Sequence, residues 1–274
     1  MHDAALTSTV TSRAGGEIYV AVRGSGPPLV WVAGLGDDHT SFDAQVDNFV
    51  EQYTCVVFDN RGTGQSTTLA GPYTMKNYAD DAHDVVAALG LGAVRAVGSS
   101  MGGAICEAWT LHYPDDVALL VLSNSWAEQD PLLDLLFGHW MALAMDGAND
   151  RLAESLLMGC FSGEYFKHHP EIIAEFLAAP LPDMDGLKAA IAACHGHDLL
   201  DRLAEINIPT LVISASRDAV VRPEMSVRMA DRIPKSHLVE IDSGHMIMWE
   251  RPDLFAAAIK AFLNEYSTAA PSAL

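Results

Sequence analysis

Short apolar runs alternate with amphipathic helical segments along the first half of the chain, and no other feature of the sequence limits the possible folds as much. The apolar runs cover residues 29–33, 55–58, 94–97 and 117–122, and helical patterns occupy residues 41–51, 76–89 and 101–112. Strands without polar alternation are buried on both faces, which is typical of a parallel sheet with helices on each side. We therefore predict an α/β fold with a mostly parallel central sheet, preceded by a hairpin of residues 7–13 and 17–22.

The alternation stops near residue 126. Residues 126–200 contain no strand-like run, and their helical patterns fall at residues 131–145, 149–158, 170–178 and 185–194. Strand-like runs return at residues 210–214 and 237–241, and a last helix is expected from Pro252. We predict a core of residues 1–125 and 201–274, with an α-helical cap, or lid, of residues 126–200 inserted before the last two strands. The final residues, 267–274, are small and polar and are expected to fray.

A serine lies between glycines where the third apolar run passes into a helix. Residues 98–102 read Gly-Ser-Ser-Met-Gly and match the pattern G-x-S-x-G. In a strand-to-helix turn this pattern forms a nucleophile elbow, which exposes the hydroxyl above the sheet. We therefore expect Ser100 to be a nucleophile, whereas Ser99 lies out of frame with the glycines. The alternative is an ordinary turn in which the serine only caps the helix.

A serine needs a base, and the base needs an orienting group. Asp218 and His245 each follow a strand-like run, at residues 210–214 and 237–241. Because ligand sites of open α/β sheets gather at the carboxyl ends of strands, we expect both side chains to meet Ser100. The acid could instead follow the run at 117–122, but no carboxylate occurs there before Glu128, so Asp218 is preferred.

Backbone amides are expected to bind the oxyanion of such a reaction. The residue after the nucleophile, Met101, would supply one amide. Leu35 would supply the other, because it lies between two glycines after the strand at residues 29–33. The alternative for this loop is a plain glycine turn.

A further segment carries a family resemblance. Residues 59–66 read Asp-Asn-Arg-Gly-Thr-Gly-Gln-Ser and resemble the D-x-R-G-x-G-x-S segment of the α/β-hydrolase superfamily, and the resemblance extends from about residue 17 to 265. It implies an α/β-hydrolase fold, a Ser100–Asp218–His245 triad, an oxyanion hole at Leu35 and Met101, and no cofactor or metal. The resemblance extends to small lid-bearing serine esterases and lactonases, such as 3-oxoadipate enol-lactonases and polyketide methyl esterases.

One position departs from the pattern of that superfamily. Many members have His-Gly before the oxyanion residue, and this chain has Ala33 before Gly34. Because the donors are backbone amides, we expect catalysis to survive this difference. Epoxide hydrolases and haloalkane dehalogenases use an aspartate nucleophile, so Ser100 argues against both.

The expected cap is rich in aromatic residues and methionine and carries twelve acidic but only three basic residues. This balance disfavours anionic substrates, so we predict a neutral, fairly apolar ester or lactone, cleaved with water. The residues expected to contact it are Trp126, Trp140, Met145 and Met246. Cleavage of a carbon–carbon bond next to a carbonyl, cofactor-free perhydrolysis, and a receptor-like relic that only binds its ligand are the alternatives.

Composition excludes other classes of partner. The formal net charge of −20 would repel nucleic acid and anionic membranes. No apolar run approaches the ~20 residues that span a bilayer, and the first ten residues do not resemble a secretory signal. We expect a cytoplasmic protein with four reduced, mostly buried thiols, at Cys55, Cys106, Cys160 and Cys194.

Overall fold

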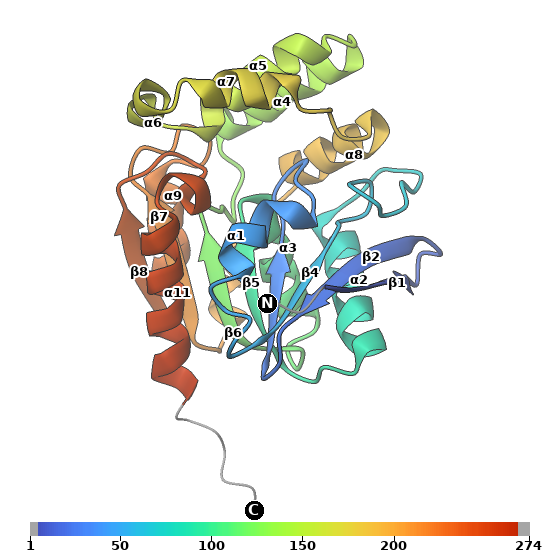
Figure 1. The fold of residues 1–274 in the computed structure, drawn as a ribbon, viewed down its shortest axis with the longest axis vertical. Coiled ribbons are helices and arrows are strands. Elements are labelled where there is room, and N and C mark those ends of the chain that lie inside the picture. Colours follow the sequence, from blue (N-terminus) through green and yellow to red (C-terminus); the bar gives the residue numbers. More distant parts are fainter. Residues whose placement is uncertain (1–4, 268–274) are drawn as a thin grey trace, which may run out of the picture.

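A computed structural model describes residues 5–267 and shows one sheet with helices on both faces (Figure 1). In these residues the sheet has eight strands in the order β1-β2-β4-β3-β5-β6-β7-β8. The first three of these strands are joined by antiparallel pairings, and all the other pairings are parallel. The strands are β1 (Leu6–Thr11), β2 (Glu17–Arg23), β3 (Pro28–Val32), β4 (Thr54–Phe58), β5 (Val94–Ser99), β6 (Val117–Ser123), β7 (Thr210–Ala215) and β8 (Ser236–Ile241). The predicted fold class is therefore confirmed.

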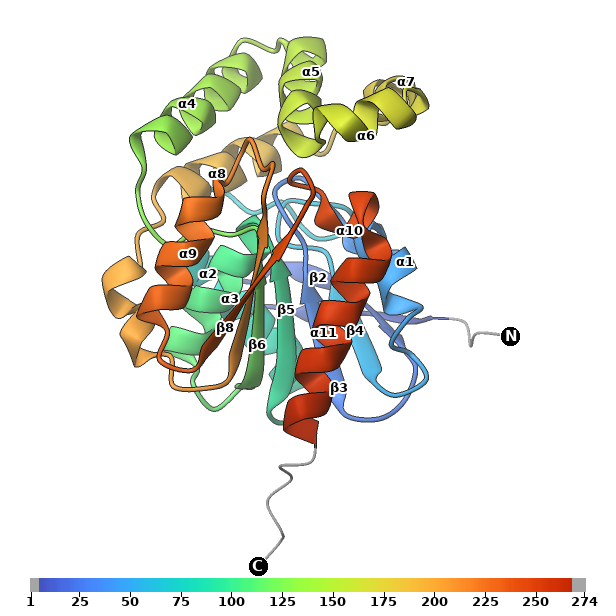
Figure 2. The same ribbon diagram turned by 90° about the vertical axis from the view of Figure 1, so that its left-hand side faces the viewer.

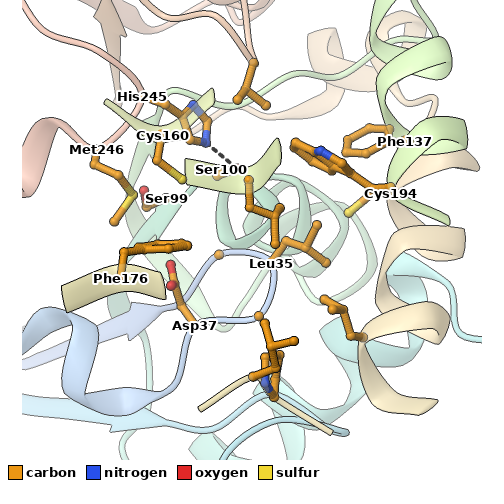
Figure 3. Close-up of a pocket in the computed structure, with 18 of the residues that line it drawn as sticks. Leu35, Asp37, Ser99, Ser100, Phe137, Cys160, Phe176, Cys194, His245 and Met246 are labelled. Carbon is orange, nitrogen blue, oxygen red and sulfur yellow. Dashed lines mark hydrogen bonds between the residues drawn. The ribbon is translucent and has the colours of Figure 1, made fainter. Parts of the chain in front are cut away.

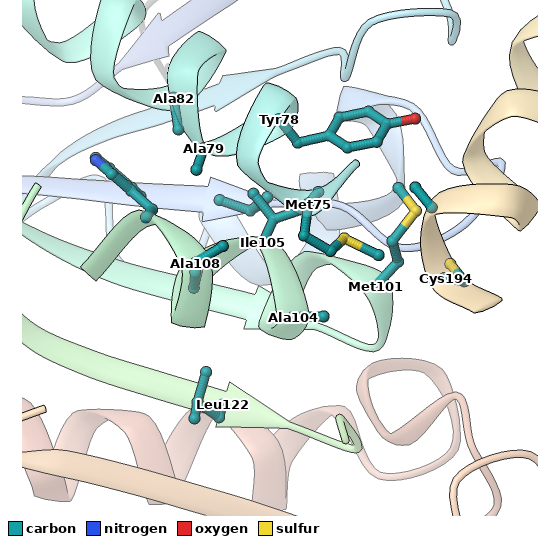
Figure 4. Packing of buried hydrophobic residues seen from close by; sticks show 14 of the residues in the cluster. Met75, Tyr78, Ala79, Ala82, Met101, Ala104, Ile105, Ala108, Leu122 and Cys194 are labelled. Carbon is teal, nitrogen blue, oxygen red and sulfur yellow. The ribbon is translucent and has the colours of Figure 1, made fainter. Parts of the chain in front are cut away.

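The two faces of the sheet bury different sets of side chains. Val30 and Val32 of β3 face α2 (Met75–Leu89) and α3 (Met101–His112), whose packing is shown in Figure 4. Between those valines, Trp31 points to the opposite face, where it packs on η1 (His39–Phe42) and the loop after it. Helix α9 (Pro223–Arg232) belongs to the first face, and α11 (Pro252–Ser267) covers the second. This double burial explains why the central strands lack polar alternation.

Five α-helices between β6 and β7 cover the carboxyl ends of the strands (Figures 1 and 2). They are α4 (Pro131–Met145), α5 (Asn149–Cys160), α6 (Gly163–His168), α7 (Glu171–Ala178) and α8 (Met184–His195). We call residues 126–200 the helical insertion. Asp130 caps α4 and accepts a hydrogen bond from Arg222 at 2.7 Å, which ties the insertion to the start of α9. None of the helices in residues 5–267 has the length and apolar character needed to cross a membrane.

The structure differs from the predicted elements at a few places. The expected helix at residues 41–51 consists of η1 and one turn, α1 (Asp43–Val46), followed by further turns that bury Phe49. Three short elements were not predicted: α6, η2 (Leu200–Glu205) and α10 (Ile247–Glu250). Each is too short for a clear apolar period. The fraying predicted for the tail falls mainly on residues 268–274, which lie outside the described residues.

Candidate active site

Ser100 lies at the turn from β5 to α3 with a backbone that few side chains adopt, at φ 55° and ψ −121°. The turn is possible because glycines lie two residues before and two residues after Ser100. A Cβ on Gly98 would lie 2.3 Å from the Gly102 carbonyl oxygen, and a Cβ on Gly102 would lie 2.0 Å from that of Val32. The glycines therefore allow close backbone approach, and the tight turn presents the hydroxyl of Ser100 at the sheet edge.

The imidazole of His245 lies between Ser100 and Asp218. The distance from His245 Nε2 to Ser100 Oγ is 2.9 Å, and that from His245 Nδ1 to Asp218 Oδ2 is 2.7 Å. In the neutral imidazole, Nδ1–H donates to the carboxylate and the serine hydroxyl donates to Nε2. The second carboxylate oxygen accepts from the amides of Val220 and Val221 at 2.8 and 2.9 Å, which holds Asp218 in place.

Asn124 supports the loop that carries the imidazole, and sequence reasoning missed it. Its backbone has φ 40°, and its side-chain amide donates to the carbonyl of His245 at 2.9 Å. The backbone amide of Asn124 donates to the carbonyl of Ile213 on β7. Asn124 follows β6 directly, so its position at a carboxyl strand end was a signal that could have found it.

The amides of Leu35 and Met101 are both free to bind a ligand. Within residues 5–267, neither amide donates a hydrogen bond to another group of the protein. Leu35 and Gly34 line the cavity above Ser100, and Met101 is the first residue of α3. Unpaired amides near a serine hydroxyl are the kind of donor that binding of an oxyanion would require.

A cavity of about 210 Å³ opens onto Ser100 and His245 (Figure 3). Trp126, Trp140 and Met246, which were expected to contact substrate, line it. Met145 does not, and its side chain is 68% exposed, so the expectation for this residue was wrong. Side chains four apart share a helix face, and the buried positions near Trp140 include Ala144, which leaves Met145 on the outer face of α4.

Other residues line the cavity besides the four that were expected to contact substrate. Phe137 packs edge to face against Trp140 with ring centroids 5.7 Å apart, and the two residues are three positions apart on α4, so they share a helix face. Phe176 of α7 reaches the cavity from the far end of the helical insertion, and no local pattern indicates this. Asp37, in the loop after β3, is the one carboxyl group among the described residues that line the cavity.

The cysteines near the site are structural and are not suited to act as nucleophiles. Cys160 and Cys194 line the cavity, and burial raises the pKa of both thiols far above the usual range. Cys106, close to Ser100 in sequence, is fully buried in the core of α3, and its pKa is raised for the same reason. Because the thiolate is the reactive form, these thiols are poor nucleophiles.

The helical insertion is joined to the loop of His245. The Met246 amide donates to the carbonyl of Cys160 at 2.9 Å. Glu250 accepts from both the amide and the hydroxyl of Ser162. A Cβ on Gly244 would lie 2.4 Å from the Ser162 amide nitrogen, so the two segments pack backbone to backbone.

Three side chains of the types that can bind a metal ion lie together at one place in residues 5–267. The ligand atoms of Asp38, His39 and Asp59 lie within 4.8 Å of one another. Asp59, however, already accepts from the His39 amide at 2.7 Å and from the Gln65 amide at 2.7 Å. These bonds tie two loops together, and we assign no metal to them.

Comparison with known proteins agrees with this geometry. The family model of the alpha/beta hydrolase fold matches residues 27–252. The chain belongs to the α/β-hydrolase fold family. This α/β hydrolase is 25% identical to a putative carbamate hydrolase RutD of Azorhizobium caulinodans over 91% of its own length and 96% of the relative's. It is 27% identical to 3-oxoadipate enol-lactonase 1 of Acinetobacter baylyi, over 93% and 96% of the two chains.

Solved structures give the same assignment. A thermophilic esterase from Thermogutta terrifontis superposes with a TM-score of 0.85 and 31% identity, over 95% of this chain and 98% of that one. Fold and relatives together identify this α/β hydrolase as an enzyme of the hydrolase class.

Proposed function

We propose that the protein is a serine hydrolase that cleaves carboxylic esters or lactones through an acyl-enzyme. The observation that carries this proposal is the hydrogen-bonded chain from Ser100 through His245 to Asp218, at the floor of a mostly apolar cavity. Three loops from different strands build this chain, and a purely structural role would not require a serine in a left-handed conformation at its end.

In the first half of the reaction, Ser100 Oγ bonds to the carbonyl carbon while its proton passes to His245 Nε2. Asp218 stabilises the imidazolium that results. The oxygen of the tetrahedral intermediate lies against the amides of Leu35 and Met101. The intermediate collapses by breaking the bond to the leaving oxygen, which takes the proton from Nε2.

In the second half, a water molecule gives a proton to His245 Nε2 and attacks the acyl carbon. The bond to Ser100 Oγ then breaks, and the proton returns to that oxygen. No redox partner or cofactor takes part in either half, and water is the only second substrate.

The substrate that best fits the cavity is a small molecule with a largely apolar body. Its walls include Trp126, Phe137 and Trp140 from the helical insertion, which we propose acts as a cap. The enol-lactonase and esterase similarity supports the ester or lactone class. Carbamates are the second candidate class of substrate, because putative carbamate hydrolases are among the relatives.

Labelling with a fluorophosphonate probe tests the nucleophile. We expect one label at Ser100 and none in Ser100→Ala, with unfolding temperatures within a few degrees of each other. A panel of p-nitrophenyl esters, lactones, carbamates and vinylogous diketones then tests the bond that is cleaved, and a peracid assay tests perhydrolysis. Labelling without turnover of any member would favour a ligand-binding relic, and unchanged turnover by Ser100→Ala would overturn the proposal.

A further inference from the structure

Asp37 places a carboxylate beside the nucleophile. The point where Gly34 would carry a Cβ lies 3.2 Å from Asp37 Oδ2 and 3.6 Å from Ser100 Cβ. Because Gly34 has no side chain there, the carboxylate and the serine flank the same space. Figure 3 shows Asp37 among the residues that line the cavity, below Ser100 and His245 in this view.

Among the described residues, the Asp37 carboxylate has no hydrogen-bonding partner. In the described part of the chain, no side chain or amide donates a hydrogen bond to it, and no lysine or arginine pairs with it. Its neighbour Asp38, by contrast, accepts from the amide and the hydroxyl of Thr40. The side chain is half-buried in the lining of the cavity, so a ligand in the cavity is placed to supply the donor that its carboxylate lacks.

Three titratable groups face Asp37. They are His245 from the loop after β8, Cys160 from the end of α5, and Asp38 from the same loop. Burial raises the pKa of Asp37 to about 6. The imidazole of His245 lowers this pKa and the charge of Asp38 raises it, and both effects are smaller than that of burial. The carboxylate is therefore ionised at neutral pH and protonated in mild acid.

An ionised carboxylate beside Ser100 also affects the reaction. It repels the negative charge that develops on the tetrahedral intermediate, and it repels any anionic substrate. A substrate with a positive group near the scissile bond would cancel both effects and satisfy the unpaired oxygens.

We propose that Asp37 is a specificity residue that makes this hydrolase prefer substrates with a protonated amine near the scissile carbonyl, over neutral and especially anionic ones. The inference rests on the proposed ester hydrolysis and names a substrate class for it. The apolar walls of the cavity contain no group that recognises charge, so they do not account for such a preference.

Three ethyl esters of similar size test the preference. Ethyl butyrate is neutral, the ethyl ester of β-alanine carries an ammonium group, and monoethyl succinate carries a carboxylate. At pH 8 we expect kcat/KM to fall in the order ammonium, neutral, anionic, with at least about a tenfold step from ammonium to neutral. Acetylcholine and 3,3-dimethylbutyl acetate repeat the comparison with the charge on the alcohol side.

The matched variants are Asp37→Asn and Asp38→Asn. In Asp37→Asn the ratio of ammonium to neutral ester should fall to near one. Asp38→Asn removes a charge from the same loop and keeps a helix-capping side chain, so the ratio should remain. The ratio is the readout because Asp37 also acts on His245, which changes the rate for every substrate.

The ratio should also depend on pH. The preference for the ammonium ester should be present well above pH 6 and should disappear as the pH falls through about 6, where Asp37 takes up a proton. A change in rate that is common to both esters cancels in the ratio. Asp37→Asn should show no such change.

Binding to Ser100→Ala separates this proposal from the proposed function. Titration calorimetry on that variant measures the affinities for the ammonium and the neutral ester. The ratio of these affinities should show the same preference, even if no ester is hydrolysed. A ratio near one in both the ethyl and the acetate series would overturn the role of Asp37 and leave ester hydrolysis intact. An equal loss in Asp38→Asn would also overturn it, because the general acidic field of the protein would then explain the preference.

Discussion

Glu250 accepts two hydrogen bonds from Ser162, one from the amide at 2.6 Å and one from the hydroxyl at 2.8 Å. Ser162 precedes α6 in the helical insertion, and Glu250 ends α10, just after the loop of His245. Glu250 is only 6% exposed, so the contact is shielded from water. The pair therefore couples the position of the insertion to the position of the imidazole.

Gly244→Ala should disturb this coupling. The new Cβ would lie 2.4 Å from the Ser162 amide nitrogen and 2.6 Å from Glu250 Oε1, so backbone must move. Because His245 is the next residue, we expect kcat to fall by roughly a hundredfold, the scale that a misplaced catalytic group costs. Gly138→Ala is the control, since a Cβ there meets nothing within 4 Å. Steady-state kinetics with circular dichroism checks both, and an unimpaired Gly244→Ala enzyme would contradict the coupling.

Asp218→Asn should keep the fold and lower kcat by about 10³- to 10⁴-fold. The asparagine amide can donate to Nδ1, which favours the wrong tautomer of His245 and leaves Nε2 unable to accept from Ser100. Asp242→Asn is the matched control, because Asp242 lies on an exposed neighbouring loop and pairs with Arg217. Glu128, the alternative acid, pairs with Arg228 instead. If Glu128→Gln proved to be the crippling change, the assignment of Asp218 would be wrong.

The parts of the fold that could be predicted are those in which sequence neighbours decide the structure. The strands are buried on both faces, so their residues are apolar throughout. Ser100, Asp218 and His245 each follow a strand, and in a parallel sheet the ends of such strands meet, as the hydrogen bonds of this structure show.

The parts that could not be predicted depend on how the insertion rests on the core. Nearly every residue of α4 is apolar, so its sequence does not indicate which face turns inward, and Met145 was placed in the cavity for that reason. Phe176 and the Ser162–Glu250 contact join segments far apart in the chain. Asp37 follows the oxyanion loop and looks like an ordinary turn acid until the cavity above it is seen.

The ion pair between Asp130 and Arg222 should give a pH-dependent contribution to stability. The hydrogen bond from Arg222 lowers the pKa of Asp130 to about 2. A carboxyl group with a lowered folded pKa stabilises the fold above its unfolded pKa of about 3.9, and this contribution disappears as the pH falls toward about 2. Asp130→Asn keeps the cap of α4 but lacks the charge. Its unfolding temperature should lie below that of the wild type at pH 7 and approach it at pH 3, whereas a pH-independent difference would contradict this origin.

Trp140 and Met145 offer a matched test of the cavity wall, because both are large residues of α4 and only Trp140 lines the cavity. Trp140→Ala should change the ratio of kcat/KM for p-nitrophenyl hexanoate over p-nitrophenyl acetate. Each lost methylene contact is worth about 1 kcal/mol, which is several-fold in that ratio. Met145→Ala should leave the ratio unchanged, since its side chain is 68% exposed.

Trp140 also donates a hydrogen bond to Ser155 at 3.0 Å, so its replacement could loosen α4 against α5. Ser155→Ala removes that bond and keeps the indole, and it separates the two effects. If Ser155→Ala changed the substrate ratio as much as Trp140→Ala, the helical insertion would act through its rigidity. If neither variant changed the ratio, the acyl chain would have to bind elsewhere, against Leu35 and Met246 on the core side of the cavity. A change confined to Trp140→Ala is the outcome that the position of the indole predicts.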